Sequence, residues 1–203
     1  MGMLSHTENH QNQETSGTEP FDAHSTAGGV SGRWSTRRIA MYALFVALTI
    51  VLSYVSIPIF PAAPFLKYDP SGIVVLVAGF AFGPMAAAIV GVLGFLPHIF
   101  GNPFGALIAI IVALALGLPA SLIYKRIHSR KGAVIGILVG AVTGLVAALL
   151  CNLVITPIYA HMGFHQVLGM IIPVLLPFNL LKFTIHGIIT FLIYKPISNL
   201  VKD

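Results

Sequence analysis

Residues 132–159 read GAVIGILVGAVTGLVAALLCNLVITPIY, an apolar stretch in which no side chain carries a charge. A run of about 20 apolar residues is long enough to cross the hydrocarbon core of a bilayer as a helix. The stretch therefore predicts a membrane-spanning helix. Its glycines repeat every four residues, at Gly132, Gly136, Gly140 and Gly144. They form a smooth stripe that lets another helix approach closely, and we expect it to serve packing inside a bundle.

The rest of the chain has the same character from Ile39 to Tyr194. Of its 203 residues, 57% are hydrophobic and only 8% are charged, whereas soluble domains carry about 25% charged residues. We place six spanning helices at residues 38–57, 70–82, 84–99, 104–124, 132–159 and 172–194. The expected fold class is an all-α membrane protein, a bundle of six transmembrane helices.

Residues 1–35 differ from the remainder because they are polar and rich in Ser, Thr, Gly, His and Glu. Such a segment buries too little apolar surface to fold. We therefore divide the chain into a disordered cytoplasmic tail at 1–35 and a transmembrane domain at 36–203. The histidines of the tail are irregularly spaced and no acid cluster or cysteine supports them, so no metal site is predicted. Cys151 is the single cysteine, which excludes a disulfide within the chain.

Lysine and arginine gather in three places. These are Arg33, Arg37 and Arg38; Lys125, Arg126, Arg130 and Lys131; and Lys195 and Lys202. Basic residues concentrate in cytoplasmic loops, so six crossings place all three clusters inside and both termini in the cytoplasm of a cell-membrane protein. The segment 70–82 covers only about 20 Å as a helix. It is kept as a crossing because otherwise the basic link at 125–131 would lie outside.

Several kinds of chemistry are missing from the sequence. It has no Walker-type phosphate loop, no HExxH pair and no GxSxG elbow. Asp69 is the one acidic residue between Arg33 and Lys202, which leaves no carboxylate relay for proton-driven transport. The chain is therefore predicted not to be an enzyme, and any energy for transport has to come from a partner.

Three polar side chains stand inside the predicted spans, in the half of the membrane nearer the outside. Asn152 lies on segment 132–159, and Asn179 and Lys182 lie three residues apart on segment 172–194, where they share a face. A lysine in this position costs at least ~2.5 kcal/mol on insertion scales. Lys182 could pair with Asp69 or bond helix carbonyls. Alternatively, the three groups line a pocket open to the outside, where two amides and an ammonium match the carbonyls and ring nitrogens of a ligand.

The stretch Pro58–Pro70 reads PIFPAAPFLKYDP and joins the first two predicted helices on the outer side. Its prolines forbid a regular helix, and its aromatic and aliphatic residues are unusual for an exposed loop. Two interpretations stay open: a lid folded over the outer pocket, or a loop packed on the helix ends.

The order of four motifs resembles a known family. These are Ala43-x-x-x-Ala47, FLKYDPS at 65–71, GFAFGP at 79–84 and PFNLLK at 177–182. Over residues 37–201 the chain resembles the S components, the substrate-binding membrane subunits of energy-coupling factor transporters, and most of all the riboflavin-specific members.

The resemblance implies high-affinity riboflavin binding and uptake. It implies that Asn152, Asn179 and Lys182 hydrogen-bond the flavin ring, with Lys182 acting as a donor because flavin is neutral near pH 7. Lys67, Tyr68 and Asp69 belong to the same expected site. The link at 161–171 is shorter than is usual for riboflavin binders. An S component for another vitamin or small heterocycle, of pyridoxine or pyrimidine type, is therefore the alternative.

The resemblance also implies partners. S components dock on a membrane coupling protein that carries two cytoplasmic ATPases, and hydrolysis there drives release of the vitamin inside. Ala43 and Ala47 would form part of the docking face, because small residues allow close helix contact. No cofactor, metal or nucleic acid is implied.

Overall fold

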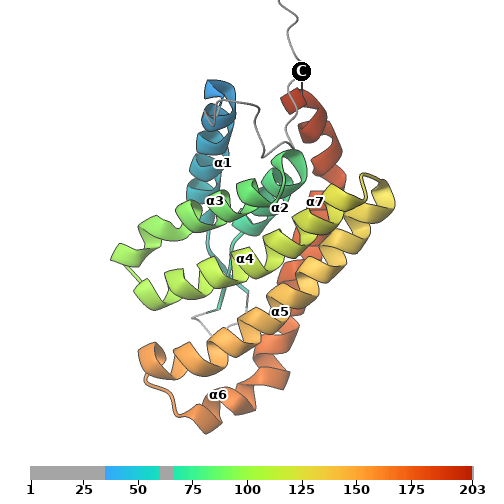
Figure 1. The fold of residues 1–203 in the computed structure, drawn as a ribbon. Helices are drawn as coiled ribbons and strands as arrows, with labels where there is room; N and C mark the ends of the chain where they lie inside the picture. The colour runs from blue at the N-terminus through green and yellow to red at the C-terminus, as the bar shows by residue number, and fades with distance from the viewer. Residues whose placement is uncertain (1–34, 60–65, 203) are drawn as a thin grey trace, which may run out of the picture.

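The computed structural model describes residues 35–59 and 66–202, which form helices and one short hairpin (Figure 1). The predicted tail at 1–35 lies outside the described residues except for Ser35. The helices are α1 (Thr36–Tyr54), α2 (Ser71–Phe82), α3 (Pro84–Phe95), α4 (Pro103–Arg126), α5 (Arg130–Ala160), α6 (Phe164–Met170) and α7 (Leu176–Lys202). A 3₁₀ turn, Leu96–Phe100, follows α3, and a π turn, Ile171–Leu175, precedes α7. The strands β1 (Ile57–Pro58) and β2 (Lys67–Tyr68) pair antiparallel.

Four helical units of the described chain are long and apolar enough to cross a membrane: α1, α4, α5 and the unit Phe164–Ile197, which contains α6, the π turn and α7 as far as Ile197. The helices α2 and α3 have 12 residues each, about 18 Å at 1.5 Å per residue. Every residue of α2 is buried, and α1, α3, α4 and α7 all contact it. A short helix enclosed in this way meets protein rather than lipid. Crossing by α2 and α3, and so the six-crossing topology, remains a prediction.

The glycine stripe of α5 packs inside the bundle, as the sequence predicts. A Cβ atom at Gly136 would lie 2.7 Å from the Ala120 carbonyl oxygen of α4. At Gly144 a Cβ would lie 3.2 Å from the Phe183 ring of α7. The stripe therefore lets α5 approach both helices more closely than alanine would.

Two connections differ from the sequence-based expectation. The link predicted at 161–171 is largely helical, and α6 runs through the π turn into α7, so the last helical unit begins earlier than residue 172. Pro173 has no N–H to offer the preceding turn, which accounts for the widened π turn here. The proline-rich stretch contains the β1–β2 pairing instead of irregular loop alone. Phe60 and Phe65, which the lid interpretation invoked, lie outside the described residues.

The basic clusters of the described chain gather at one end of the bundle. Figure 1 shows the start of α1, the α4–α5 link and the C-terminal part of α7 toward the same upper end. Met41 of α1 joins the same core cluster as Ile193 and Ile197 of α7, and Arg130 and Lys195 line one hollow. This grouping is the one the positive-inside argument requires. That this end faces the cytoplasm stays a prediction.

Candidate functional site

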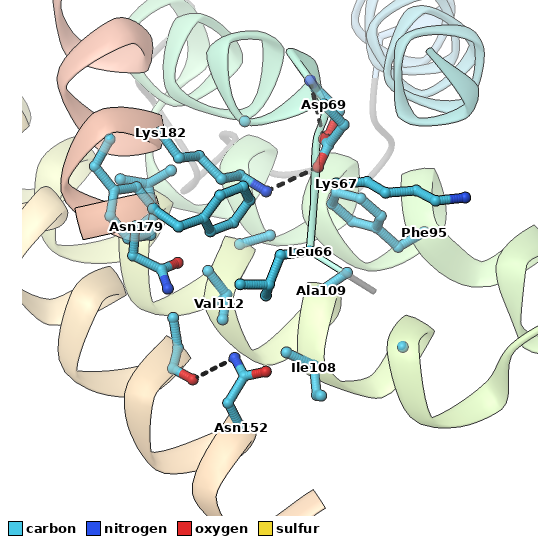
Figure 2. A pocket seen from close by; sticks show the side chains of 18 of the residues that line it. Leu66, Lys67, Asp69, Phe95, Ile108, Ala109, Val112, Asn152, Asn179 and Lys182 are labelled. Carbon is cyan, nitrogen blue, oxygen red and sulfur yellow. Dashed lines mark hydrogen bonds and ion pairs between the residues drawn. The ribbon is translucent and has the colours of Figure 1, made fainter. Parts of the chain in front are cut away.

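A cavity of about 190 Å³ lies at the other end, enclosed by β2, α2, α4, α5 and α7 (Figure 2). Five of the six residues predicted to bind substrate line it: Lys67, Asp69, Asn152, Asn179 and Lys182. Tyr68 does not line it. Its side chain instead packs in a core cluster with Leu66, Val167 and Phe178.

Asp69 and Lys182 form an ion pair across the cavity, with 2.8 Å between the lysine Nζ and the aspartate Oδ2. Both side chains are mostly buried, at 16% and 19% exposure. The backbone N–H of Ser71 also donates to Asp69 Oδ1 at 3.2 Å, and the Ser71 hydroxyl donates to the same oxygen. Burial alone would raise the pKa of Asp69, but the Lys182 ammonium and the Ser71 hydroxyl bring it below its ordinary value. The carboxylate therefore stays ionised, and the two charges cancel within the cavity wall.

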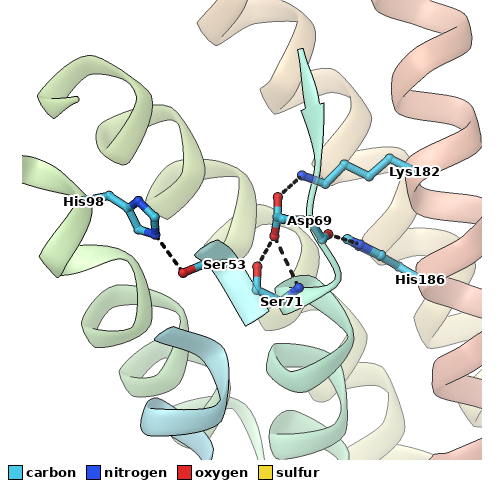
Figure 3. A network of polar contacts seen from close by, with 6 residues as sticks. All are labelled: Ser53, Asp69, Ser71, His98, Lys182 and His186. Carbon is cyan, nitrogen blue, oxygen red and sulfur yellow. Dashed lines mark hydrogen bonds and ion pairs between the residues drawn. The ribbon is translucent and has the colours of Figure 1, made fainter. Parts of the chain in front are cut away.

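His186 holds the backbone of the same aspartate. Its Nε2 donates to the Asp69 carbonyl oxygen at 2.9 Å, while its buried Nδ1 has no partner among the described residues. The ring packs against Gly72, where a Cβ atom would lie 2.5 Å from Nδ1, and against the Tyr68 ring, 5.6 Å between centroids. Figure 3 shows Lys182 and His186, one turn apart on α7, reaching the same residue. The end of the hairpin is thus tied to α7 by two side chains.

The two predicted asparagines reach the cavity from neighbouring helices, Asn152 from α5 and Asn179 from α7 (Figure 2). Asn152 Nδ2 donates to the Ala148 carbonyl at 2.7 Å, and Asn179 Nδ2 donates to the Leu175 carbonyl at 2.8 Å. Each bond joins a residue to the one four positions earlier, so it fixes the amide against its own helix. A primary amide has two N–H groups, which leaves one donor on each asparagine. Asn179 Oδ1 accepts no hydrogen bond within the described part of the chain and remains available as an acceptor.

The remaining wall is largely apolar. Its side chains include Leu66, Phe95, Ile108, Val112, Phe178 and Phe183. Apolar walls with a few fixed polar groups are the usual composition of small-molecule sites. An apolar ring system could therefore lie between these walls while its polar edge meets the amides.

A second hollow, about 330 Å³, adjoins the cavity and shares Lys67, Asp69, Phe95 and Asn102 with it. Its wall is more polar and adds Ser53, Ser56 and His98. The Ser53 hydroxyl and His98 Nε2 lie 2.7 Å apart, and the Tyr54 ring stacks on His98 with 4.3 Å between centroids.

Sequence reasoning assigned Lys67 and Asp69 of this second hollow to the site, but not Ser53, Ser56, His98 and Asn102. They are brought together by the packing of α1, the 3₁₀ turn and the start of α4, which no local pattern records. Asn102 is the one of these residues with a local role, because it is the N-cap of α4: its side chain accepts from the Gly105 N–H at 2.9 Å. Sequence reasoning also did not assign His186, which bonds the Asp69 carbonyl, to the site.

Ala43 and Ala47, the predicted docking residues, are exposed on α1. Leu44, Leu48 and Val51 on this helix are exposed as well, while Tyr42 and Phe45 face the core. The small residues therefore lie on a surface of the bundle that no described element covers.

The structure thus combines helices long and apolar enough to cross a membrane with a partly polar cavity beside a short hairpin. The family model described as "ECF transporter, substrate-specific component" matches residues 37–194, and the chain belongs to this family. It is thus the substrate-binding subunit of a transporter and not an enzyme, in a family that works with ATPases and a membrane coupling protein.

A solved structure agrees with this assignment. It is described as "Structure and mechanism of the S component of a bacterial ECF transporter". The two chains are 26% identical, the match covers 82% of this chain and 98% of that one, and the TM-score is 0.71. No curated protein matches this chain by sequence.

Proposed function

We propose that the chain binds riboflavin in the cavity between β2, α4, α5 and α7, as the first step of its uptake. The observation that carries this proposal is the ion pair between Asp69 and Lys182 at 2.8 Å. Because the pair is internally neutral, the part of the cavity next to the amides offers polar groups without an unpaired charge. Lys67, the other cation of the lining, extends away from the amides (Figure 2), so a neutral heterocycle would meet donors and acceptors there.

The placement of the amides supports the flavin ring as that heterocycle. The pyrimidine-like edge of flavin alternates carbonyl oxygens and ring nitrogens. Asn152 and Asn179 each keep one free N–H, and Asn179 keeps a free carbonyl oxygen, so they can pair with such an edge. Lys182 has three donors and uses one on Asp69, so it can donate to a flavin carbonyl without leaving the pair.

The adjoining hollow suits the rest of the molecule. Riboflavin carries a chain of hydroxyl groups on its ring system. Ser53, His98 and Asn102 offer hydroxyl, imidazole and amide groups in a space continuous with the cavity. We place the ring among the apolar walls and the hydroxylated chain toward these three residues.

The cavity alone, at about 190 Å³, is smaller than the roughly 300–1,000 Å³ usual for ligand sites, so the vitamin needs the adjoining hollow of about 330 Å³ as well. The strand β2 forms part of the cavity wall, and Asp69, which follows it, is held by bonds from Lys182 and His186. We propose that β2 moves away from α7 to admit the vitamin and returns over it, which is the first of the two interpretations of the proline-rich stretch.

The same small volume favours one alternative, a smaller neutral heterocycle of pyridoxine or pyrimidine type. A competition experiment separates the two. The purified chain is titrated with riboflavin, followed by fluorescence quenching, and then challenged with pyridoxine, uracil and lumichrome, the ring without its hydroxylated chain. Riboflavin binding that only lumichrome displaces supports the proposal. Absence of quenching, with direct binding of pyridoxine or uracil by calorimetry, supports the alternative.

For coupling, we propose that the α1 surface around Ala43 and Ala47 docks on the membrane coupling protein. Both alanines are exposed, and small residues permit close approach of a partner helix.

A further inference from the structure

An apolar groove runs along the outside of the bundle between α5 and α7. It encloses about 480 Å³, and its rims are leucine, isoleucine and valine side chains such as Leu138, Val142 and Leu192. Thr184 is the one polar side chain among the described residues that line it. At its floor the helices touch, because a Cβ atom at Gly187 would lie 2.8 Å from Ile137 Cγ2. The groove is thus a furrow over a tight helix contact, open to the lipid.

The groove continues into a basic hollow at the end where the cationic clusters gather. This hollow, about 440 Å³, shares Phe191 and Leu192 with the groove and adds Arg130, Lys195 and Asn199. Among the described residues the one acidic side chain is Asp69, and it is paired with Lys182. Arg130 and Lys195 therefore have no acidic partner within that part of the chain.

The dimensions match one leaflet of a bilayer. From Leu180 to Leu192 the groove follows α7 for about 18 Å at 1.5 Å per residue. Half of a hydrocarbon core is about 15 Å. The apolar groove therefore has the length of an acyl chain, and the basic hollow lies at its end, where a phospholipid has its phosphate.

We propose that an anionic phospholipid occupies this site, with an acyl chain in the α5–α7 groove and its phosphate between Arg130 and Lys195. Basic pockets between helices on the cytoplasmic side are the usual sites for acidic headgroups. A partner helix fits less well, because helix contacts in membranes favour small residues while the rims here are long and exposed. The small-residue surface of this bundle lies on α1 instead. The groove and the vitamin cavity have only Phe183 in common among their lining residues, and the proposed lipid site does not depend on which vitamin is bound.

Native mass spectrometry of the full chain in mild detergent tests the proposal. Phosphatidylglycerol and phosphatidylcholine with identical acyl chains are added in equal amounts. We expect about tenfold preference for phosphatidylglycerol, given two cations at the headgroup. In Arg130→Gln/Lys195→Gln the preference falls to near unity. The matched control Lys125→Gln/Arg126→Gln removes the same charge from neighbouring positions outside the hollow and keeps the preference.

A second variant probes the apolar part. Ala141→Trp places an indole in the groove and is expected to reduce retention of phosphatidylglycerol at unchanged charge. A preference that survives Arg130→Gln/Lys195→Gln, or that is lost equally in the control pair, overturns the proposal. The proposal is also overturned if the wild-type chain forms a dimer without bound lipid and Ala141→Trp dissociates that dimer. Such a result would assign the groove to a second copy of the chain.

Discussion

Replacing Lys182 separates its two roles, in stability and in ligand binding. In Lys182→Met the Asp69 carboxylate, 16% exposed, loses its counter-ion. Breaking a buried ion pair from one side costs about 3–5 kcal/mol of folding free energy. The variant also loses a charged donor to the ligand. Hydrogen bonds to charged groups contribute about 1.5–3 kcal/mol, so riboflavin binding is expected to weaken at least tenfold.

The double variant Lys182→Met/Asp69→Asn distinguishes the effects. It leaves no unpaired charge in the cavity, so thermal unfolding in detergent should return toward the wild-type midpoint. Riboflavin affinity, measured by fluorescence quenching, should stay at least tenfold weaker because the donor is still missing. Lys131→Met, at the opposite end of the bundle, is the control and should change neither property. Wild-type affinity in the double variant would refute the assignment of Lys182 to the ligand.

Three further predictions use the same measurements. Asn179→Leu removes a donor and a free acceptor from the cavity and should weaken riboflavin binding about tenfold; an unchanged titration would exclude this amide from the site. Gly72→Ala brings a Cβ 2.5 Å from a buried imidazole nitrogen and should lower stability by about 1–3 kcal/mol. Gly163→Ala is the control and should not lower stability, because no atom lies within 4 Å of the added Cβ. Equal melting midpoints for the two variants would contradict the packing described for Gly72. Ala43→Trp should abolish uptake in cells with riboflavin binding intact, whereas Val154→Trp, exposed on α5, should spare both; normal uptake with Ala43→Trp would remove α1 from the docking surface.

The helices and the convergence of the polar groups could be predicted because both follow from local rules. Apolar runs mark the long helices, and helical rise and period place Asn152, Asn179 and Lys182 at one depth. The structure brings them to one cavity. Of the alternatives considered for Lys182, the ion pair with Asp69 is present, and it forms part of the cavity wall, so pairing and pocket are not exclusive.

What could not be predicted depends on contacts between distant residues. The bond from His186 to the Asp69 carbonyl joins residues 117 positions apart, and no periodicity records it. The polar hollow with Ser53 and His98 depends on how α1 meets the turn after α3. The helical character of 164–170 was missed because its short apolar pattern lies between Gly163 and Pro173, residues that usually mark a loop.

The central claim, a neutral flavin held in the cavity, is tested most directly by the absorbance spectrum of the full chain purified in mild detergent from cells supplied with riboflavin. The account predicts a visible flavin band that remains with the protein through purification and is released as green-fluorescent riboflavin on denaturation. The band should be strongly reduced in Lys182→Met/Asp69→Asn purified in the same way. A colourless wild-type protein that also fails to quench added riboflavin would contradict it.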